Sequence, residues 1–342
     1  MKFVLCLICL SAPLCAQDWS WLEHNQVIDL HQNFDAFDTP IEIDFDSSGN
    51  LFIVDLRANS IFKVSPHGEI LFSFGRPGGG PGEFRGVYDI SVDRHANRIW
   101  VSDQRARKVA CYNEGGELLF EKTPQIQPYG IACRSDGYLA VGGTGSNNLI
   151  LLNPKGEFVK EFGRDMNRPM EGAGLKSHNS RFMYMTYGPD DRLYVAYLNE
   201  PVLACYNKSG KLLWEAERPW TYQDGEPIKT VDRGMTFDVQ AYQANLCLMD
   251  GVVYMSTGKR EHAIIAMDAK TGKYLGFRKP PMRARSFALW QDKIYSLNAA
   301  EGTLHIHNKK PAFKTIQAHK NYTNRYLVDG ATSLAKPAAK GK

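Results

Sequence analysis

The chain has 342 residues, a formal net charge of +4 and 43% hydrophobic residues. The length suits a single repeat architecture, and the apolar content allows a sizeable core to form. The mild charge gives no indication of nucleic-acid binding. No apolar run beyond the N-terminal region approaches the length that a membrane-spanning helix requires.

The first residues predict a secretory signal peptide. Lys2 supplies a positive start, residues 3–10 form an uncharged apolar run, and residues 11–16 are small and turn-prone. Cleavage is expected near Ala16, which assigns residues 1–16 to the signal and makes the mature protein secreted or periplasmic. A buried first strand is the alternative. A lipoprotein anchored at Cys15 is disfavoured by the Pro-Leu pair before it.

Residues 40–75 form the first copy of a sequence repeat. Its apolar stretches at 40–45, 51–55, 60–64 and 69–74 each have the length of a strand, and turn residues separate them. This pattern predicts four antiparallel strands, which together make one blade of a β-propeller.

Five further copies follow, and the sixth is incomplete because it lacks a clear fourth strand. Residues 27–30 are expected to supply that strand, so that the N- and C-terminal segments pair and close the ring without an open sheet edge. A seventh blade, or a fourth strand drawn from residues 313–316, is the alternative. The propeller is predicted over residues 17–316, with later copies near residues 89–120, 128–163, 188–214, 250–273 and 290–306.

The first three copies resemble NHL repeats. They share a proline-led strand, an Asp-x-x-Gly turn that leads into the strand at 50–55, and a glycine turn after the third strand. The Gly-rich link at 75–84 also matches the links between blades in that family. The resemblance covers most of residues 38–308. It implies an all-β, six-bladed β-propeller of four-stranded antiparallel blades, a fold that serves many functions.

Blade topology sorts the loops onto two faces. The loops between the first and second strands, and between the third and fourth, are short turns on one face. The other face carries the loops between the second and third strands together with the links between blades. We call it the long-link face, because three of its links, at 164–180, 216–240 and 277–284, are extended. Long loops on a rigid scaffold are common sites of function.

Arginines are frequent on the long-link face, Arg85 among them. The guanidinium fork binds carboxylate or phosphate through two parallel hydrogen bonds, so this face is predicted to bind an acidic protein, peptide or anionic glycan. Tyrosines near the starts of the inner strands are expected to ring the channel, unless they pack between blades. A solvated basic surface without a ligand is the alternative. The candidate ligand-binding residues are Arg57, Tyr88, Arg105, Arg107, Tyr129, Tyr184, Arg260 and Arg285.

The favoured function is a noncatalytic binding or scaffold module without a cofactor or metal. It is expected to act as a monomer or within an envelope complex, with no nucleic-acid partner. The architecture also resembles peptidyl-hydroxyglycine amidating lyase and virginiamycin B lyase, which implies a metal-assisted lyase or hydrolase at the channel mouth as the alternative. His178 and His262 lie on the long-link face without a visible metal-binding partner. His305 and His307 share a strand face away from the channel.

Three further expectations concern structural roles. Asp55 and Asp103 recur at the end of the second strand and are expected to satisfy turn backbone. The basic segment at 317–342 is predicted to be disordered. Four cysteines remain after signal removal, and they are expected to be small core residues more often than disulfide partners: Cys111, Cys133, Cys205 and Cys247.

Overall fold

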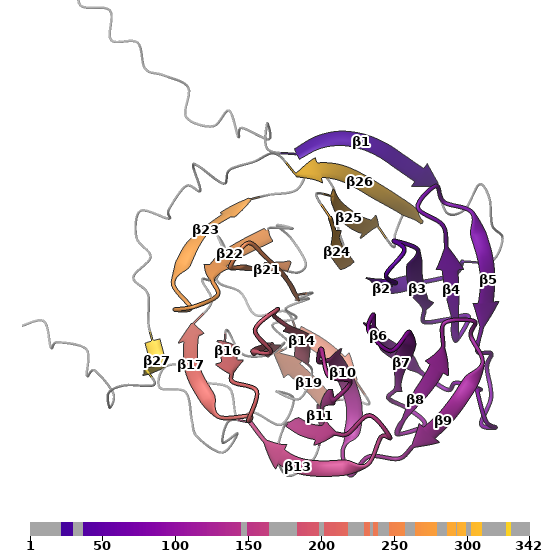
Figure 1. Ribbon diagram of the computed structural model, residues 1–342, viewed down its shortest axis with the longest axis horizontal. Helices are drawn as coiled ribbons and strands as arrows, with labels where there is room; N and C mark the ends of the chain where they lie inside the picture. The colour runs from indigo at the N-terminus through magenta and orange to yellow at the C-terminus, as the bar shows by residue number, and fades with distance from the viewer. Residues whose placement is uncertain are drawn as a thin grey trace, which may run out of the picture.

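The computed structural model shows six antiparallel sheets arranged in a ring (Figure 1). It describes residues 22–29, 37–144, 149–163, 183–197, 202–217, 229–232, 235–238, 246–256, 264–278, 286–291, 293–298, 302–309 and 326–329. Every named element in these ranges is a β-strand. No helix in the described ranges has the length and apolar character needed to cross a membrane.

Each blade contains four strands that follow one another from the centre of the ring to its rim. The innermost strands of neighbouring blades contact one another, and β24 contacts β2 to complete the circle. From the inside outward, blade 1 consists of β2 (Pro40–Phe45), β3 (Leu51–Asp55), β4 (Ser60–Val64) and β5 (Ile70–Phe74), and blade 2 consists of β6 (Val87–Asp93), β7 (Arg98–Asp103), β8 (Lys108–Asn113) and β9 (Leu118–Lys122). In the same order, blade 3 consists of β10 (Gln127–Cys133), β11 (Leu139–Thr144), β12 (Leu149–Leu152) and β13 (Phe158–Phe162), and blade 4 consists of β14 (Met183–Tyr187), β15 (Leu193–Tyr197), β16 (Val202–Tyr206) and β17 (Leu212–Glu217). Blade 5 consists of β20 (Leu246–Met249), β21 (Val252–Ser256), β22 (Ile264–Asp268) and β23 (Tyr274–Arg278), and blade 6 consists of β24 (Ser286–Trp290), β25 (Lys293–Asn298), β26 (Thr303–Lys309) and β1 (Leu22–Asp29).

Blade 6 closes the ring with strands from both ends of the chain. β1 pairs antiparallel with β26, and the register places Val27 opposite His305 and Ile28 opposite Leu304. This confirms the predicted closure by the N-terminal segment and the count of six blades. The proposed alternative strand at 313–316 lies outside the described residues.

The core lies between the blades, because each sheet is apolar on both faces. One cluster joins Phe52 and Val54 of blade 1 to Ile90 and Val101 of blade 2. All four are buried. Stacking neighbouring repeats in this way buries a continuous core that no single blade could bury alone.

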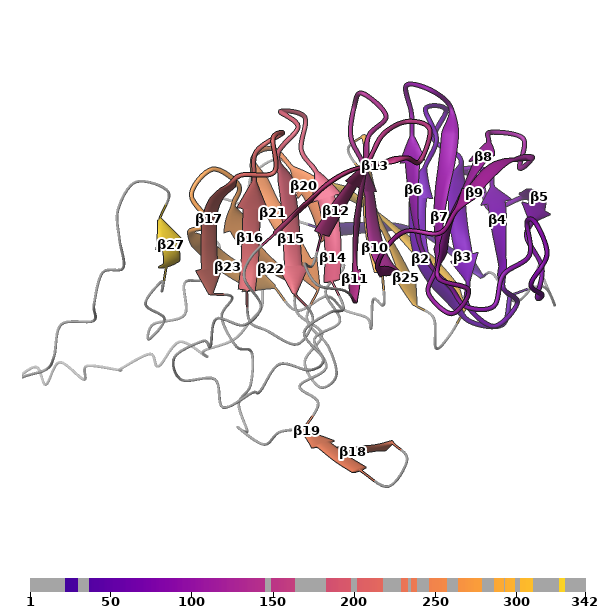
Figure 2. The ribbon, with the colours of Figure 1, turned by 90° about the horizontal axis from the view of Figure 1, so that it is seen from below.

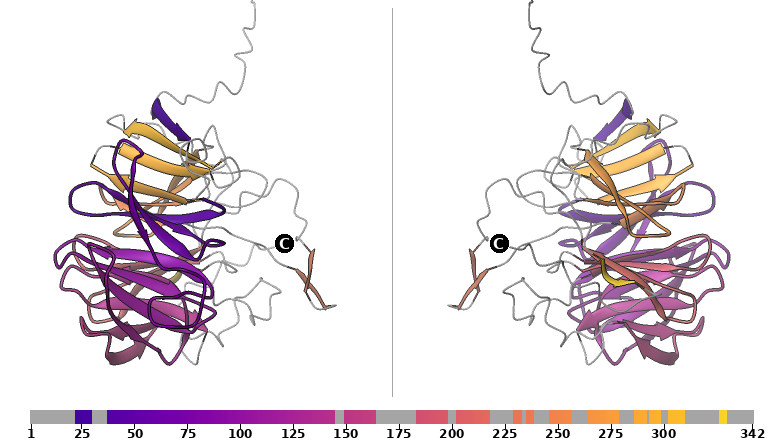
Figure 3. Two further views of the ribbon diagram at one scale, coloured as in Figure 1. Left: turned by 90° about the vertical axis from the view of Figure 1, so that its right-hand side faces the viewer. Right: turned by 90° about the vertical axis from the view of Figure 1, so that its left-hand side faces the viewer.

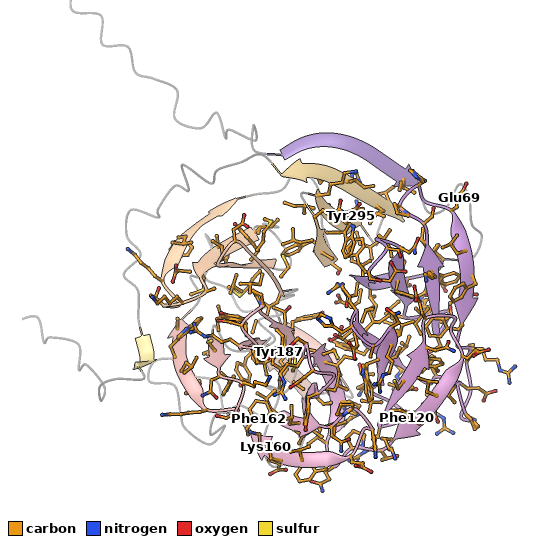
Figure 4. The ribbon with its side chains drawn as sticks, viewed as in Figure 1. Glu69, Phe120, Lys160, Phe162, Tyr187 and Tyr295 are labelled. Atoms are coloured by element: carbon orange, nitrogen blue, oxygen red, sulfur yellow. The ribbon has the colours of Figure 1, made fainter. Side chains whose placement is uncertain are left out.

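In blades 1 to 5, a glycine in the turn between the third and fourth strands seats the blade against its neighbour. Gly116 of blade 2 has a φ of +81°, and a Cβ there would lie 3.0 Å from ring atoms of Phe72 and Phe74 on β5. Gly156 and Gly210 meet Phe120 and Phe162 in the same way, and both aromatic residues lie toward the rim of the ring (Figure 4). Two further pairs follow the pattern, Gly68 with Ile28 and Gly272 with Trp214.

Two short pieces of structure lie outside the six blades. Residues Tyr326–Asp329 form β27, which pairs with the outer strand β17 of blade 4. The rest of the segment 317–342, for which disorder is expected, lies outside the described residues. Within the long link at 216–240, β18 (Lys229–Asp232) and β19 (Met235–Asp238) pair as a hairpin beyond one face of the ring (Figure 2).

The four cysteines within the described residues, Cys111, Cys133, Cys205 and Cys247, are free thiols. Cys111 and Cys205 are fully buried in the third strands of blades 2 and 4, which confirms their predicted core role. Burial raises the pKa of both thiols to about 12. They are therefore protonated and unreactive at neutral pH.

Candidate functional site

The long-link face can be followed in detail over blades 1 and 2, where the chain is described without a gap from 37 to 144. Figure 3 shows the ring in profile, with the two faces on opposite sides. The predicted residues Arg260 and Arg285, together with His178 and His262, lie outside the described residues. The site is therefore built from the loops at 56–59 and 104–107 and from the segments that enter β2 and β6.

In blade 1, one buried carboxylate organises the long-link face. Asp55, at the end of β3, is fully buried. Its oxygens accept the backbone N–H groups of Asp38 at 2.7 Å and Thr39 at 2.9 Å from the entering segment. They also accept those of Arg57 at 3.0 Å and Ala58 at 2.9 Å from the following loop. Asp55 therefore satisfies turn backbone, as predicted, and it fixes two segments relative to each other.

Blade 2 repeats this arrangement around Asp103, which is also fully buried. Asp103 accepts the backbone N–H groups of Arg85 at 2.8 Å and Ala106 at 2.9 Å. The backbone N–H of Gln104 donates to the Gly86 carbonyl at 3.0 Å, just as that of Leu56 donates to Thr39 at 2.9 Å in blade 1.

These hydrogen bonds define equivalent positions in the two blades. Arg85 occupies the place of Asp38, because the N–H of each donates to the organising carboxylate. Arg105 then corresponds to Arg57. Position 107 corresponds to 59, and both residues have a left-handed backbone, with φ of +56° and +49°.

The side chains at the equivalent positions differ in charge. In blade 1, Arg57 forms an ion pair with Asp38 at 3.4 Å, and position 59 is a neutral Asn. In blade 2, all three positions are exposed arginines, and none forms an ion pair or hydrogen bond through its side chain within the described part of the chain. We call Arg85, Arg105 and Arg107 the blade 2 arginines.

Most other arginines with described side chains are paired with an acid. Arg98 has a backbone partner instead of an acid, because its guanidinium group donates to the Pro154 carbonyl at 2.8 Å. The paired arginines and their acids are Arg57 with Asp38, Arg76 with Glu83, Arg94 with Asp44, Arg134 with Asp136 and Arg192 with Asp190. Among the arginines with described side chains, the blade 2 arginines therefore stand out because no described residue pairs with them.

The backbone at Arg107 is strained for the residue it carries. A left-handed conformation costs an ordinary L-residue about 1 kcal/mol or more, whereas Asn tolerates it better. Blade 1 places Asn59 there, and blade 2 places an arginine. The strain is of the kind that often accompanies a functional side chain.

Two glycines make room for the other two arginines. A Cβ at Gly79 would lie 2.4 Å from the Nη2 atom of Arg85, and one at Gly86 would lie 2.7 Å from the Cγ of Arg105. The guanidinium group of Arg85 and the aliphatic stem of Arg105 therefore rest against bare backbone. The glycine-rich link between blades 1 and 2 thus shapes the arginine surface.

The predicted tyrosines separate into two roles. Tyr88 and Tyr129 pack edge to face between blades 2 and 3, with ring centroids 5.3 Å apart. The Nε2 of Gln104 donates to the Tyr129 hydroxyl at 2.9 Å, which braces the loop that carries Arg105 and Arg107. Tyr88 and Tyr129 therefore pack between blades, which is the alternative that the sequence offered for these tyrosines. Tyr184 borders the central channel.

A channel of about 230 Å³ lies between the six innermost strands. Blades 1 and 2 give it an acidic wall, which the sequence analysis did not foresee: Glu42, Asp44 and Asp89. Blades 4 to 6 give it an apolar wall that includes Met185, Leu246 and Phe287. Tyr187, near the centre of the ring in Figure 4, also borders it.

The carboxyl groups in the channel brace neighbouring blades. Asp89 accepts the backbone N–H of Ile131 in blade 3 at 2.8 Å, and Asp44 accepts that of Val92 in blade 2 at 2.7 Å. Burial raises the pKa of Asp89 from 3.8 to about 7, and the nearby charge of Asp44 adds to the rise. Asp89 is therefore a carboxyl group that changes its charge near neutral pH.

No group of three or more metal-binding side chains within the described ranges could hold a metal ion. His305 and His307 lie on β26, away from the channel as predicted, with parallel rings whose centroids are 6.3 Å apart.

The fold and its repeats define an NHL-like six-bladed β-propeller. Residues 39–146 match the model of a family described as a 6-bladed beta-propeller. NHL repeat-containing protein 3 of Homo sapiens is 31% identical over 87 residues, which cover 24% of this chain and 25% of that protein. The Mus musculus protein of the same name matches to the same extent. The chain thus spans about a quarter of the length of the curated relatives it matches.

Solved structures share the fold at low sequence identity. A Bacteroides fragilis protein described as exported has a TM-score of 0.59 and 15% identity, covering 85% of this chain and 96% of that one. Virginiamycin B lyase from Staphylococcus aureus has a TM-score of 0.55 and 16% identity, covering 83% and 98%. These similarities concern the fold alone.

Proposed function

We propose that this propeller is an exported, noncatalytic binding module that holds an anionic ligand with the blade 2 arginines. One observation carries the proposal. Blades 1 and 2 share the same backbone arrangement around Asp55 and Asp103. In blade 1, Asp38 neutralises the charge of Arg57, whereas blade 2 presents three arginines that no described residue pairs with. Adjacent like charges repel each other, so a ligand that supplies negative charge is stabilised there.

Three features of the site support binding rather than a merely solvated surface. Asp103 and the Gln104–Tyr129 hydrogen bond hold the backbone that carries the arginines, which lowers the entropy lost on binding. Gly79 leaves space for the guanidinium group of Arg85, and Gly86 leaves space for the stem of Arg105. Arg107 retains a backbone conformation that disfavours its own residue type. Export rests on the N-terminal pattern at residues 1–16, which makes envelope or extracellular anions the relevant ligands.

The test is a binding experiment with two matched variants. Hexaglutamate and a heparin-derived hexasaccharide serve as peptide and glycan probes. The double variant Arg85→Asp with Arg107→Asn gives blade 2 the charges of blade 1. The variant Lys155→Glu with Lys211→Gln changes the net charge by the same amount at exposed positions on the opposite face. We expect the first variant to weaken probe binding roughly tenfold or more, and the second to leave it nearly unchanged. Equal affinity of both variants and the parent would contradict the proposal.

A further inference from the structure

We infer that the group recognised by the blade 2 arginines is a tetrahedral dianion of the phosphate-monoester type. The inference rests on the proposed function and names the class of ligand for the same site. In blade 1, the Nη1 of Arg57 lies 3.4 Å from an oxygen of Asp38, at the two positions that Arg105 and Arg85 occupy in blade 2. Side chains at these two backbone positions therefore reach a common point.

Blade 2 places two guanidinium groups at these positions. The backbone positions of Arg85 and Arg105 match those of Asp38 and Arg57, because Asp103 and the Gln104–Gly86 hydrogen bond reproduce the backbone of blade 1. Where blade 1 has a carboxylate next to an arginine, blade 2 lacks the acid. An anion bound between the two guanidinium groups would replace the missing carboxylate. The third arginine, at 107, lies two residues beyond Arg105 on the same loop.

Charge and donor number favour a tetrahedral dianion over a single carboxylate. A guanidinium carries five N–H donors and one positive charge, so three of them offer far more than the two oxygens and single charge of a carboxylate can use. A phosphate monoester presents three acceptor oxygens and a charge of about −1.5 to −2 at neutral pH. Acceptors pointing in three directions can be shared among three arginines, which two coplanar oxygens cannot do.

Among the described residues, the acids closest to these arginines in sequence are already engaged elsewhere. Glu83 lies close in sequence, but its carboxylate pairs with Arg76 at 2.9 Å and accepts the backbone N–H of Gly80 at 2.8 Å. These bonds hold the pKa of Glu83 below its usual range and turn its charge toward Arg76. Asp103 is fully buried beneath the loop, where it holds backbone N–H groups.

The experiment is isothermal titration of the full mature chain with four small probes. Glycerol 2-phosphate represents a phosphate monoester, inorganic phosphate and inorganic sulfate represent the bare tetrahedral ion, and succinate carries the same charge on two separate carboxylates. We expect glycerol 2-phosphate to bind roughly tenfold more tightly than succinate. Binding should strengthen between pH 5.5 and 7.5 as the phosphate loses its second proton, whose pKa is about 6. Sulfate, which stays doubly charged, should show no such rise.

The variants and probes distinguish binding of a tetrahedral dianion from anion binding in general. Arg85→Asp should remove at least tenfold of the affinity for glycerol 2-phosphate, because it restores the internal pair of blade 1, while the charge-matched Lys155→Glu should not. Comparable affinities of the ester and inorganic phosphate show recognition of the group itself. Tighter binding of the ester shows that its carrier is contacted as well, and either result supports the inference. Equal affinity for succinate overturns the dianion class but leaves anion binding intact. Affinities that Arg85→Asp does not change overturn both.

Discussion

Blades 1 and 2 use one backbone arrangement to present two different surfaces. In both, a buried aspartate at the end of the second strand holds the entering segment and the following loop. In blade 1 the exposed positions form an ion pair and an Asn, and in blade 2 they are three unpaired arginines. The comparison shows that the repeat supplies a common backbone frame, while a few exposed positions set the charge of the surface it presents.

The largest expected effect comes from removing the frame itself. Asp55→Ala leaves the backbone N–H groups of Asp38, Thr39, Arg57 and Ala58 without their acceptor. We expect the free energy of unfolding to fall by about 4 kcal/mol, because buried donors without a partner are costly. Asp103→Ala removes the acceptor of two backbone donors and should cost about 2 kcal/mol. Urea unfolding measures both values. An equal loss of unfolding free energy in the two variants would contradict the prediction that Asp55 contributes more than Asp103 because it accepts more backbone N–H groups.

The second prediction concerns how the stability of the protein depends on pH through Asp89, on the inner strand of blade 2. Because the pKa of Asp89 is raised to about 7, the native state keeps a proton between pH 4 and 7 that the unfolded chain has lost. Stability should therefore decline as pH rises from 5 to 8, by roughly 3 kcal/mol, and level off above the folded pKa. Asp89→Asn cannot titrate, so urea unfolding of this variant should show a flatter dependence over the same range. A wild-type profile that is flat or rises from pH 5 to 8 would contradict the assignment.

The third prediction concerns the seating of blade 2 on blade 1. Gly116→Ala places a Cβ 3.0 Å from ring atoms of Phe72 and Phe74 and imposes a side chain on a φ of +81°. We expect a loss of about 2 kcal/mol in the free energy of unfolding. Gly115→Ala is the control, because a Cβ there would meet only the Asn113 side chain at 3.4 Å. Thermal unfolding that affects both variants equally would argue against the glycine contact.

The smallest effect has the opposite sign. Arg107→Asn installs the residue that blade 1 carries at the same left-handed position, so it should stabilise the protein by about 0.5 to 1 kcal/mol. The same change should weaken anion binding, since one positive charge is lost. Thermal unfolding and titration with glycerol 2-phosphate measure the two effects. A variant that is less stable than the parent would show that position 107 is not strained.

The propeller was predictable from sequence because its signals are local and repeated. Each strand begins and ends at turn residues such as Gly49 and Gly68, and six copies reinforce one interpretation. The recurrence of Asp55 and Asp103 likewise predicted their role in the turns. Patterns of this kind can be recognised in the sequence because strands and turns depend mainly on residues that are neighbours in the chain.

The site was only partly predictable, because its meaning depends on pairs that are distant in sequence. Arg57 and Arg105 look alike in the sequence, and only the position of Asp38 opposite one and Arg85 opposite the other distinguishes them. The segments that carry Asp38 and Arg85 share a phenylalanine just before these residues, Phe37 and Phe84, but differ around it, so their equivalence becomes clear through the hydrogen bonds to the organising aspartates. The acidic wall of the channel was missed for the same reason, since Glu42 and Asp89 line one cavity from two different blades.

Closure by β1 has a consequence for the timing of folding. The pairing of residues 22–29 with residues 303–309 joins nearly opposite ends of the chain, so it is the contact with the highest entropic cost of formation. A chain that emerges N-terminus first, from a ribosome or through a membrane pore, carries its first strand unpaired until the sixth repeat has appeared. Five blades can stack before that moment, but the ring gains its full cooperativity in one late step.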